Sequence, residues 1–509
     1  MPLIAAVLLL ALPWLNPFAP GPTPAVPTLL FSWTCAALFL LGCAVVRFRA
    51  GSLPRVAAAA WLVAALLSAF IGVLQYFGGT EGFNGWVNGT SVGEAFGNLR
   101  QRNQFATLTN MGLIALLWWT LSGHAQEGVV AGALKQAHST WVTFLAVGSA
   151  ALLAAGNAAS SSRTGLAQLL MVLVIGGAWG HQHVRVRAVL VCAGLSYGLA
   201  AFFFPVMAGL DANSTGILSR LHESNAACAG RLTLWANVLH LIAQKPGFGW
   251  GWGELDYAHF ITLYPDERFC DILDNAHNLP LHLAVELGVP FATIACAVGL
   301  WLVLRGKPWR EADPTRQMAW AVLAVIGLHS LLEYPLWYGP FQIAAGLCVG
   351  LLWRNPCTAS VARQNFKGFR PIATVWTACI ASVLIASCAY AAWDYWRVSQ
   401  LYLLPAQRSS IYRDNTLDKL RGSWLFKNQV QFAELTTTPV TADNAAQLRD
   451  QALQLLHFSP EPRVIEKLIE SAVLLGRDEE AAYYLERYRA AFPEAHTRWA
   501  AESASHKAP

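Results

Sequence analysis

Charged side chains are scarce in this 509-residue sequence: 13% of the residues are Asp, Glu, Lys or Arg, and 55% are hydrophobic. Soluble globular proteins carry about 25% charged residues, so this composition excludes an ordinary cytosolic enzyme of this length. The scarcity is also uneven. Residues 394–509 hold 29 charged residues in 116 positions, and residues 1–393 hold the remaining 36. The sequence therefore predicts an apolar body, 1–393, followed by a soluble domain, 394–509.

Two further absences narrow the function classes. No run of Lys or Arg occurs, and the formal net charge is only +5. The lack of a basic run and the small net charge exclude the basic surface that is typical of nucleic-acid-binding proteins. The ten cysteines form no C-x-x-C pair, which disfavours a zinc site or a dense disulfide framework. The 21 Trp and 24 Phe exclude a disordered chain.

Long apolar runs fill the body. A helix needs about 20 apolar residues to cross a bilayer. We therefore predict an all-α fold: a polytopic membrane bundle of about eleven spans, followed by a helical soluble domain. The first run is short enough to resemble a signal peptide, but it lacks basic residues at its start. The predicted spans are residues 3–16, 27–46, 56–77, 105–122, 139–156, 166–181, 188–208, 278–304, 318–337, 341–353 and 371–393.

The Lys and Arg residues between the spans predict the orientation, because cytoplasmic loops carry an excess of positive charge. With the N-terminus in the cytoplasm, the five inside loops hold 14 Lys or Arg, and the four short outside loops hold three. A large loop at about 209–277 and the domain at 394–509 are then predicted to face the periplasm of a bacterium. The three outside arginines, Arg100, Arg102 and Arg163, need an explanation other than topology.

The large loop contains two cysteines, Cys228 and Cys270. An oxidising periplasm permits a disulfide between them. Two separate thiols fit the same spacing, so the sequence leaves both alternatives open.

The soluble domain has the pattern of paired helices. Val464, Leu468 and Ala472 recur at helical spacing in residues 461–475, and a second helix is expected from about Glu479 to a stop at 492–493. The pair resembles one tetratricopeptide-type unit, and residues 447–456 predict a further helix of the stack. Two functions remain open for this domain: docking of a partner or acceptor, and simple solubilisation of the membrane body.

His277 and Asn278 stand where the large loop meets the eighth predicted span. A histidine has an unperturbed pKa of about 6.5, which suits a general base in the periplasm. The alternative is a histidine that caps a helix or lies at the membrane interface.

Several arginines lie on the predicted outside face. Arg163 follows three serines at 160–162 and precedes an apolar span. The planar guanidinium of arginine matches phosphate oxygens, and the hydroxyls and helix start would add donors. The alternative is an arginine that snorkels to lipid headgroups. Together with Arg163, the arginines Arg231, Arg220, Arg100 and Arg102 form a set that suits a diphosphate ligand delivered from the bilayer.

Two aromatic and glycine features accompany Arg231. It opens an amphipathic stretch typical of an interfacial helix. Residues 246–253 then read Pro-Gly-Phe-Gly-Trp-Gly-Trp-Gly. Alternating glycines allow close approach to something flat or chain-like, and an aromatic belt at the headgroups is the alternative.

His329 and Glu333 are four residues apart and share a helix face. A carboxylate at membrane depth normally has a partner, and His277, an arginine and His329 are the candidates. The acidic stretch before His277 has no established metal-ligand spacing, so we predict a solvated loop and no metal or other cofactor. Its members are Asp266, Glu267, Asp271 and Asp274.

These motifs together resemble the Wzy/WaaL superfamily of undecaprenyl-diphosphate-dependent glycan polymerases and ligases, and most closely the PglL-type bacterial protein O-oligosaccharyltransferases. His277-Asn278, nine residues and Gly288 fit the ligase pattern, whereas Phe291 departs from its last position. The other blocks are residues 97–104, 162–165, 231–235 with 246–249, and 329–337. The resemblance covers about residues 1–395.

The resemblance implies a membrane glycosyltransferase of the GT-C-like type in the inner membrane. The donor would be an oligosaccharide on undecaprenyl diphosphate, and the acceptor a Ser or Thr hydroxyl of a periplasmic protein such as pilin. His277 would activate that hydroxyl, and Arg163 and Arg231 would hold the diphosphate. Arg102, Arg220, Glu333, His329 and Asn278 would support them, in a metal-independent, inverting transfer.

Three rival functions use the same motifs. An O-antigen ligase would transfer the glycan to lipid A-core, and a Wzy polymerase would extend another lipid-linked glycan. A transporter of lipid-linked glycan would need charged groups at several membrane depths, whereas the candidate groups here cluster at one predicted face. The helical domain and residues 101–103 favour a protein acceptor.

Overall fold

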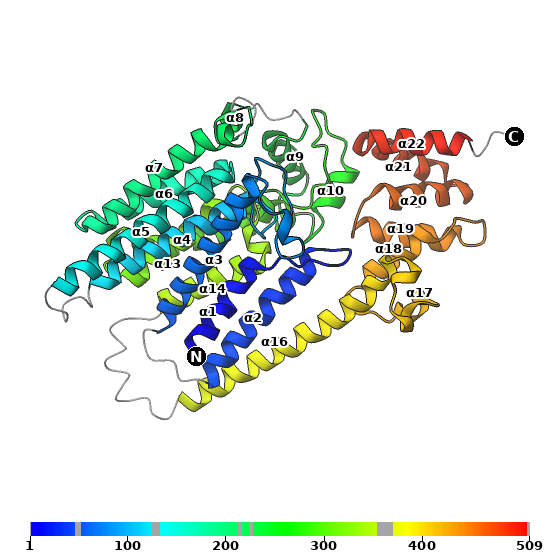
Figure 1. Ribbon diagram of the computed structural model, residues 1–509. Coiled ribbons are helices and arrows are strands. Elements are labelled where there is room, and N and C mark those ends of the chain that lie inside the picture. Colours follow the sequence, from blue (N-terminus) through cyan, green and yellow to red (C-terminus); the bar gives the residue numbers. More distant parts are fainter. Residues whose placement is uncertain are drawn as a thin grey trace. The chain divides into compact units, whose positions relative to one another are not determined.

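The described chain is helical almost throughout. The computed structural model describes residues 2–45, 52–124, 133–211, 216–222, 228–353 and 370–505. Within these ranges it contains helices joined by turns and no β-strand, which confirms the predicted all-α class (Figure 1). The chain forms two compact units. Unit 1 is Met1–Glu223 with Leu304–Ala389, and unit 2 is Ser224–Val303 with Tyr390–Pro509.

Eight helices of the described ranges are long and apolar enough to cross a membrane. Two shorter apolar helices, α1 (Pro2–Leu15) and α14 (Gly339–Trp353), lie where two more spans were predicted. The count of about eleven spans stays a prediction. The eight are α2 (Ala25–Val45), α3 (Ser52–Tyr76), α4 (Arg102–His124), α5 (Ala133–Ala159), α6 (Arg163–Gly180), α7 (Val184–Met207), α12 (Val289–Gly306) and α16 (Arg370–Ser399).

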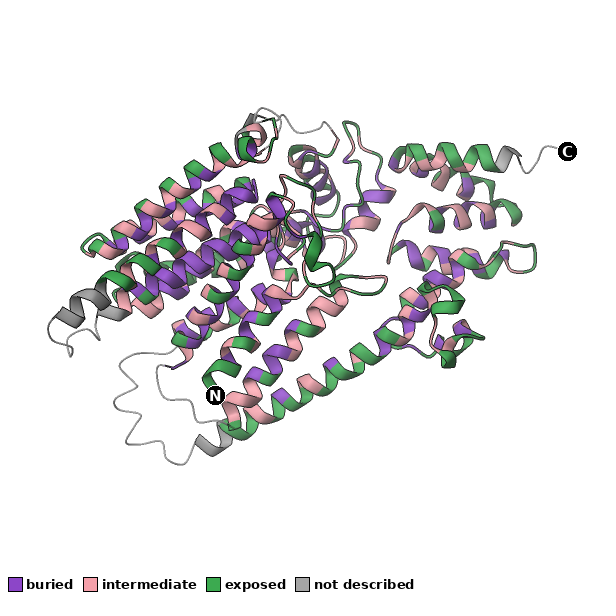
Figure 2. Cartoon of the chain, viewed as in Figure 1, coloured by how far each residue is buried: buried purple, intermediate pink, exposed green. Residues whose placement is uncertain are grey.

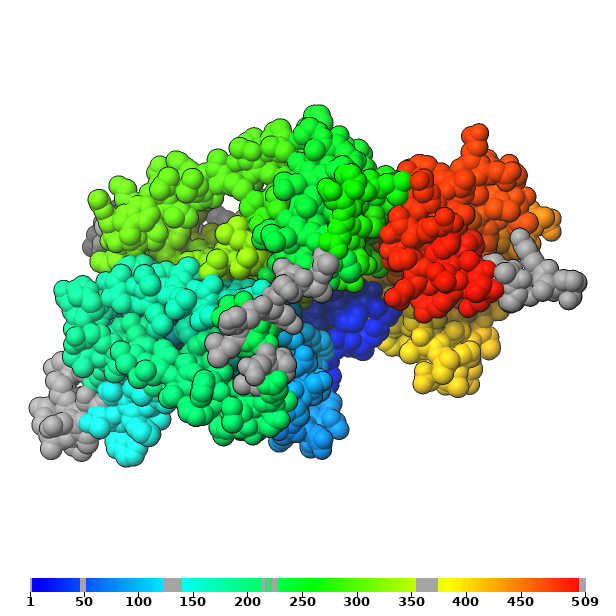
Figure 3. Space-filling view, turned by 90° about the horizontal axis from the view of Figure 1, so that it is seen from above, coloured from blue at the N-terminus to red at the C-terminus, as the bar shows by residue number. Residues whose placement is uncertain are grey.

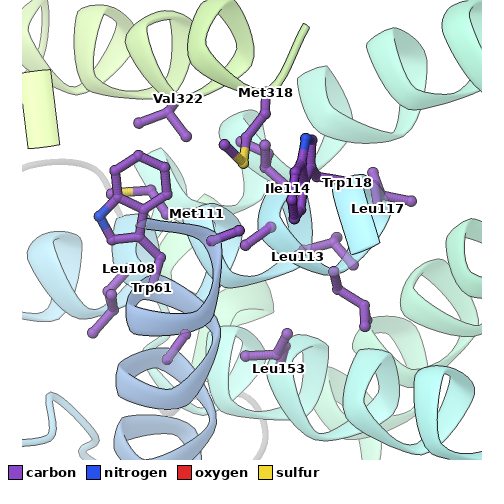
Figure 4. Packing of buried hydrophobic residues seen from close by; sticks show 14 of the residues in the cluster. Trp61, Leu108, Met111, Leu113, Ile114, Leu117, Trp118, Leu153, Met318 and Val322 are labelled. Carbon is purple, nitrogen blue, oxygen red and sulfur yellow. The ribbon is translucent and has the colours of Figure 1, made fainter. Parts of the chain in front are cut away.

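The core of unit 1 surrounds α4, which is buried along most of its length. Side chains of α3, α5 and α13 (Pro314–Ser330) meet those of α4 in one hydrophobic cluster (Figure 4). Helix α16 shows the opposite pattern, with exposed apolar side chains along most of its turns (Figure 2). Exposed apolar surface of this extent is typical of a segment that faces lipid. The residues labelled in the cluster include Trp61, Leu108, Met111, Leu153, Met318 and Val322.

The eighth predicted span is two helices, not one, so the prediction of a single helix over 278–304 was wrong. Helix α11 (Leu279–Leu287) ends at Gly288, and α12 begins at Val289. Gly288 has a φ of 89°, and a Cβ added there would collide with the carbonyl of Gly247. The Val289 amide donates to the Pro246 carbonyl at 2.9 Å. The break therefore comes from a close backbone contact with the glycine-rich loop, which the helical pattern does not reveal.

The ninth predicted span also ends early. Helix α13 stops at Ser330, and a turn leads to the short 3₁₀ helix η4 (Pro335–Trp337). Glu333 consequently lies in this turn and does not continue the helix face of His329. The prediction of one helix over 318–337 was wrong for its last seven residues, where Pro335 has no amide hydrogen to donate.

Unit 2 joins the large loop to the predicted soluble domain. The loop contributes α9 (Arg231–Gln244) and α10 (Leu255–Ile261), and α11 and most of α12 follow it in the same unit. Phe260 of α10 lies in the same hydrophobic cluster as residues of the last helices, and the Arg487 side chain donates to the Ile261 carbonyl at 2.8 Å. Within this unit, the green loop atoms adjoin the red atoms of the C-terminal helices in Figure 3. The last helices thus complete the core beneath α10.

The C-terminal helices lie where the sequence predicted them. Helix α19 (Ala445–Leu456), α20 (Pro462–Leu474) and α21 (Asp478–Ala491) match the three expected helices. Val464, Leu468 and Ala472 are buried, as their spacing predicted. The tetratricopeptide-like character and the domain boundary at 393–394 stay predictions. The remaining helices are α17 (Thr416–Leu420), α18 (Lys427–Thr437) and α22 (Pro493–Ser505).

We expect Gly288→Ala to lower the melting temperature of the purified protein, whereas Gly299→Ala leaves it unchanged. A residue with a side chain at the positive φ of Gly288 costs about 1–3 kcal/mol before any collision. Gly299 lies on α12 with open space where a Cβ would be added. Thermal unfolding in detergent measures both variants, and equal melting temperatures would contradict this account of the break.

Candidate active site

The predicted site residues divide between the two units. Unit 1 holds the arginines at the start of α4 and α6 and the arginine within α8 (Gly216–His222), together with the end of α13 and the turn after it. Unit 2 holds the disulfide-bearing loop and the start of α11. The unit 1 residues are Arg102, Arg163, Arg220, His329 and Glu333, and the unit 2 residues are Cys228, Arg231, Cys270, His277 and Asn278.

Arg163 is the first residue of α6, and its side chain is exposed. Ser162 caps the helix: its hydroxyl accepts from the Gly165 amide at 2.9 Å. Ser161, just before the cap, has a left-handed φ of 51°. The unsatisfied amides of a helix start favour anions, and Arg163 adds a full positive charge at the same point. This end of α6 is therefore suited to a phosphate group.

Arg220 comes to the same turn from α8. Its guanidinium donates to the Ser161 carbonyl at 3.4 Å. Arg163 and Arg220 therefore flank one short turn between α5 and α6, although 57 residues separate them in the sequence. Two arginines at one helix start match the two negative groups of a diphosphate better than one.

Arg102 was expected to contact the diphosphate, but its side chain is already paired with a carboxylate of the protein. Its guanidinium forms an ion pair with Glu94 at 3.0 Å, and both side chains are partly exposed. The Glu94 carboxylate balances the charge of Arg102 locally. Arg102 is therefore a weaker candidate for diphosphate binding than Arg163 or Arg220.

A series of polar side chains runs along one face of α4. Asn103, Thr107 and Asn110 are spaced at one helical turn each. The Asn103 amide nitrogen donates to Glu333 Oε1 at 3.0 Å, and Ser162 Oγ donates to Asn103 Oδ1 at 2.6 Å. The sequence predicted His277, an arginine or His329 as the partner of Glu333, and Asn103 was missed. Its position on the polar face of an apolar helix was the available signal.

Thr107, the second residue of this polar series, contacts His329, which is completely buried. Its Nδ1 lies 2.9 Å from Thr107 Oγ1. Gln168 of α6 donates to the same hydroxyl at 2.9 Å and to the Val325 carbonyl at 2.8 Å. His329 therefore belongs to a hydrogen-bond network that joins α4, α6 and α13, and this placement supports a structural role.

His277 has a strained backbone. Its φ is 50°, and its amide donates to Asn275 Oδ1 at 2.9 Å. Positive φ is uncommon in residues with a side chain and concentrates at functional sites. Asn278 is the residue that caps α11, because its side chain accepts from the Leu281 amide at 3.1 Å. The capping role therefore belongs to Asn278, and the His277 ring remains half-buried just before the helix.

Helix α9 supports the segment before His277. Trp235 Nε1 donates to the Ala276 carbonyl at 3.1 Å. Asn237 donates to the Glu267 carbonyl at 3.0 Å and accepts from the Phe269 amide at 2.8 Å. The helix that Arg231 begins is thus hydrogen-bonded to this segment at Glu267, Phe269 and Ala276.

A disulfide joins Cys228 to Cys270, with 5.3 Å between the Cα atoms. Cys228 lies three residues before Arg231, and Cys270 lies seven residues before His277. The disulfide therefore ties the start of α9 to the segment before His277. It leaves only a short stretch of chain between the bond and Arg231, and between the bond and His277.

The glycine-rich segment 246–253 packs on α11. The Trp250 and Gly251 amides donate to the Val285 and Glu286 carbonyls, each at 2.9 Å. The glycines thus allow one backbone to approach another, whereas the alternatives from the sequence were approach to something flat or chain-like and an aromatic belt at the headgroups. Two of the segment's aromatic side chains are exposed, Phe248 at 94% and Trp252 at 61%, whereas Trp250 Nε1 donates to the Leu241 carbonyl at 3.0 Å.

A buried acid–base pair beneath this segment was not predicted. His282 Nε2 lies 3.5 Å from Glu286 Oε2, and both side chains are almost fully buried. The two residues are one turn apart on α11, and this spacing in the sequence was the available signal that they pair.

The comparisons with known families cover most of the chain. Residues 95–120 match the family described as protein glycosylation ligase, and residues 148–296 match that of O-antigen ligase. Residues 317–506 match the C-terminal part of the virulence factor membrane-bound polymerases. No solved structure matches the chain.

Two curated relatives come from Acinetobacter baylyi. One, a general O-oligosaccharyltransferase, is 24% identical over 365 residues, which is 68% of this chain and 58% of the relative. The other, a ComP-specific O-oligosaccharyltransferase, is 22% identical over 284 residues, 54% of this chain and 47% of the relative. The chain thus spans about half the length of the curated relatives it matches.

The apolar helices and these matches indicate a multi-pass membrane protein that is similar to the O-antigen ligase superfamily. The match at 95–120 and both relatives make this similarity one to the PglL-type protein O-oligosaccharyltransferases. The resemblance drawn from the sequence motifs is confirmed.

We expect the double replacement Cys228→Ser with Cys270→Ser to lower the free energy of unfolding by about 2–4 kcal/mol, because the bond closes a long loop. Cys296→Ser removes an exposed free thiol on α12 and is the matched control, with no change expected. The bond also requires an oxidising compartment. Alkylation of both Cys228 and Cys270 in the unreduced protein from cells would contradict the bond and the predicted periplasmic side.

His259 of α10 makes the loop sensitive to acid. It is 3% exposed, with Nδ1 2.8 Å from the Tyr264 hydroxyl and Nε2 3.1 Å from the Phe269 carbonyl. Burial, and secondly the charge of Arg268, lower the pKa of His259 from 6.5 to about 3. Between pH 6.5 and about pH 3, the His259 ring is therefore neutral in the folded state and protonated in the unfolded state.

We expect acid to destabilise the protein through His259. Between pH 6.5 and about pH 3 the unfolded state binds one more proton at this residue, so stability falls as pH falls. The limiting slope for one proton is about 1.4 kcal/mol per pH unit. His259→Gln removes this slope, and the exposed His181→Gln keeps it. Melting curves at pH 7 and pH 5 measure the difference, and parallel curves for wild type and His259→Gln would contradict it.

Proposed function

We propose that this protein transfers an oligosaccharide as one block from undecaprenyl diphosphate to Ser or Thr hydroxyls of periplasmic proteins such as pilin. The observation that carries the proposal is the match of residues 95–120 to the protein glycosylation ligases, together with two relatives named O-oligosaccharyltransferases. The chemistry of the two residue sets described above supports it.

The arginines supply the donor side of the reaction. Arg163 and Arg220 flank the start of α6, where a diphosphate would meet two guanidinium groups and free helix amides. Arg231 begins α9 and is proposed as a third diphosphate ligand, and Arg102 as a minor one. Fixed positive groups stabilise the negative charge that grows on the leaving diphosphate. We propose that these arginines replace a metal ion in this role.

His277 supplies the acceptor side. We propose that its imidazole accepts the proton of the acceptor hydroxyl while the hydroxyl oxygen attacks the anomeric carbon. The bond from that carbon to the diphosphate oxygen breaks in the same step, and undecaprenyl diphosphate leaves with the electron pair. A single displacement of this kind inverts the anomeric configuration. A positioned general base typically increases the rate of an enzymatic reaction by about 10²- to 10⁴-fold.

The membrane arrangement follows from the same proposal. We propose about eleven spans in the bacterial inner membrane, with the N-terminus in the cytoplasm and the large loop and residues 394–509 in the periplasm. The distribution of Lys and Arg between the predicted loops supports this orientation. We further propose that the C-terminal helices form a tetratricopeptide-like domain.

The deciding experiment mixes purified protein, in nanodiscs, with a lipid-linked oligosaccharide and one of two acceptors: pilin or lipid A-core. We expect glycan on pilin. Glycan on lipid A-core alone would favour an O-antigen ligase, which is the second candidate because residues 148–296 match that family. Elongated lipid-linked glycan without either product would favour a polymerase. Glycan crossing the bilayer without a covalent product would identify a transporter.

We expect His277→Ala to reduce the turnover rate by about 10²- to 10⁴-fold with little change in the KM of the lipid-linked donor, because the base acts on the acceptor. Arg163→Ala is expected to raise the donor KM, because it removes a diphosphate contact. His181→Ala and Arg187→Ala replace exposed residues elsewhere in unit 1 and serve as controls. Full turnover by His277→Ala would exclude His277 as the base.

A further inference from the structure

The hydrogen bonds that join α6 to α4 and to the turn after α13 form a series with one possible direction. A backbone amide only donates, so Ser162 Oγ must accept from Gly165 N at 2.9 Å. The Ser162 hydroxyl hydrogen is then directed to Asn103 Oδ1, at 2.6 Å. The Asn103 amide nitrogen, in turn, donates to Glu333 Oε1 at 3.0 Å.

The carboxylate at the end of this series decides the orientation of the Asn103 amide. Glu333 Oε1 is an acceptor in this contact, so it faces the NH₂ group of the amide. If the amide were turned over, its NH₂ group would face the Ser162 hydroxyl and its oxygen would face another acceptor. The cap of α6 would then lose the acceptor for its own hydroxyl hydrogen.

The surroundings make such a loss costly. Ser162 is completely buried, Thr164 and Glu333 are buried as well, and Gly165 has no room for a Cβ because of Ala106 and Asn157. A buried polar group without its partner is destabilising, and the low dielectric of the surroundings increases the effect.

The Arg163 side chain, by contrast, is exposed, so its position depends on the backbone at the start of α6. Arg220 reaches this backbone through the Ser161 carbonyl. The hydrogen-bond series therefore ends directly at the turn that both arginines share. It draws on three segments that are far apart in the sequence: the start of α4, the turn before α6 and the turn after α13.

We propose that Asn103 is a positioning residue for the Arg163–Arg220 turn, and that Glu333 acts by fixing the orientation of the Asn103 amide. Neither side chain touches the donor in this proposal; both act through Ser162 and the first turn of α6. The part that concerns diphosphate rests on the proposed function, whereas the directed hydrogen-bond series stands on the geometry alone.

Two isosteric replacements test the direction of the series. Asn103→Asp places two carboxylates against each other at the 3.0 Å contact, so we expect a lower melting temperature and a donor KM raised by about tenfold or more, which corresponds to about 1.4 kcal/mol. Glu333→Gln still offers an amide oxygen to Asn103, so we expect donor KM within about threefold of wild type.

The double variant Asn103→Asp with Glu333→Gln is the decisive one. The amide then stands at position 333 and donates to the carboxylate at position 103, whose second oxygen accepts from Ser162. We expect this exchange to restore both the melting temperature and the donor KM to within about threefold of wild type. Asn84→Asp, an exposed change in the same unit, combined with Glu333→Gln is the control and is expected to show no such coupling.

The outcomes test the directed hydrogen-bond series and the positioning role separately. A double variant that is no better than Asn103→Asp in either measurement overturns the directed series. A restored melting temperature with an uncorrected donor KM overturns the positioning role. If Asn103→Asp alone does not fold, the double variant is the test: a folded double variant supports the directed series, and a double variant that also fails to fold overturns it. A wild-type protein that uses no lipid-linked donor overturns the proposed function, while the coupling in melting temperature still tests the series.

Discussion

The need to pair polar groups inside an apolar helix bundle governs the arrangement of unit 1. A bilayer offers no water to hydrogen-bond to buried amides, hydroxyls and carboxylates, so each must find its partner within the protein. The polar face of α4 meets this need by contacting α6 and the end of α13. The same bonds that satisfy these groups fix where α6 begins. The start of α6, where Arg163 and Arg220 meet, is therefore a consequence of buried pairing.

A second constraint governs the loop that carries His277. The segment 262–277 has no helix of its own, and it depends on contacts from both sides. The disulfide and α9 support it at one side, and the C-terminal helices complete the core beneath α10 at the other. This shared core adds a third role for the C-terminal helices, beside the docking and solubilising roles considered from the sequence. A rigid support of this kind is what the strained backbone of His277, the proposed base, requires.

The proposed chemistry also accounts for the arginines that contradict the topology rule. Lys and Arg between the predicted spans mostly lie on the predicted cytoplasmic side, where they act as orientation signals. Arg163 lies on the predicted periplasmic side, at a helix start whose preceding turn Arg220 contacts. Arg102, also on that side, is balanced by Glu94. Local pairing thus distinguishes two arginines that the sequence treats alike.

The sequence by itself determined the helices, the separation of apolar and charged regions, and the family motifs. These features depend on local periodicity and composition, which is why α19, α20 and α21 lie where they were predicted. Only the tertiary structure decided the break at Gly288, the partner of Glu333 and the bond between Cys228 and Cys270. Each of these joins segments distant in the chain. Their pairing depends on which backbones and buried polar atoms come into contact, and no local pattern contains that information.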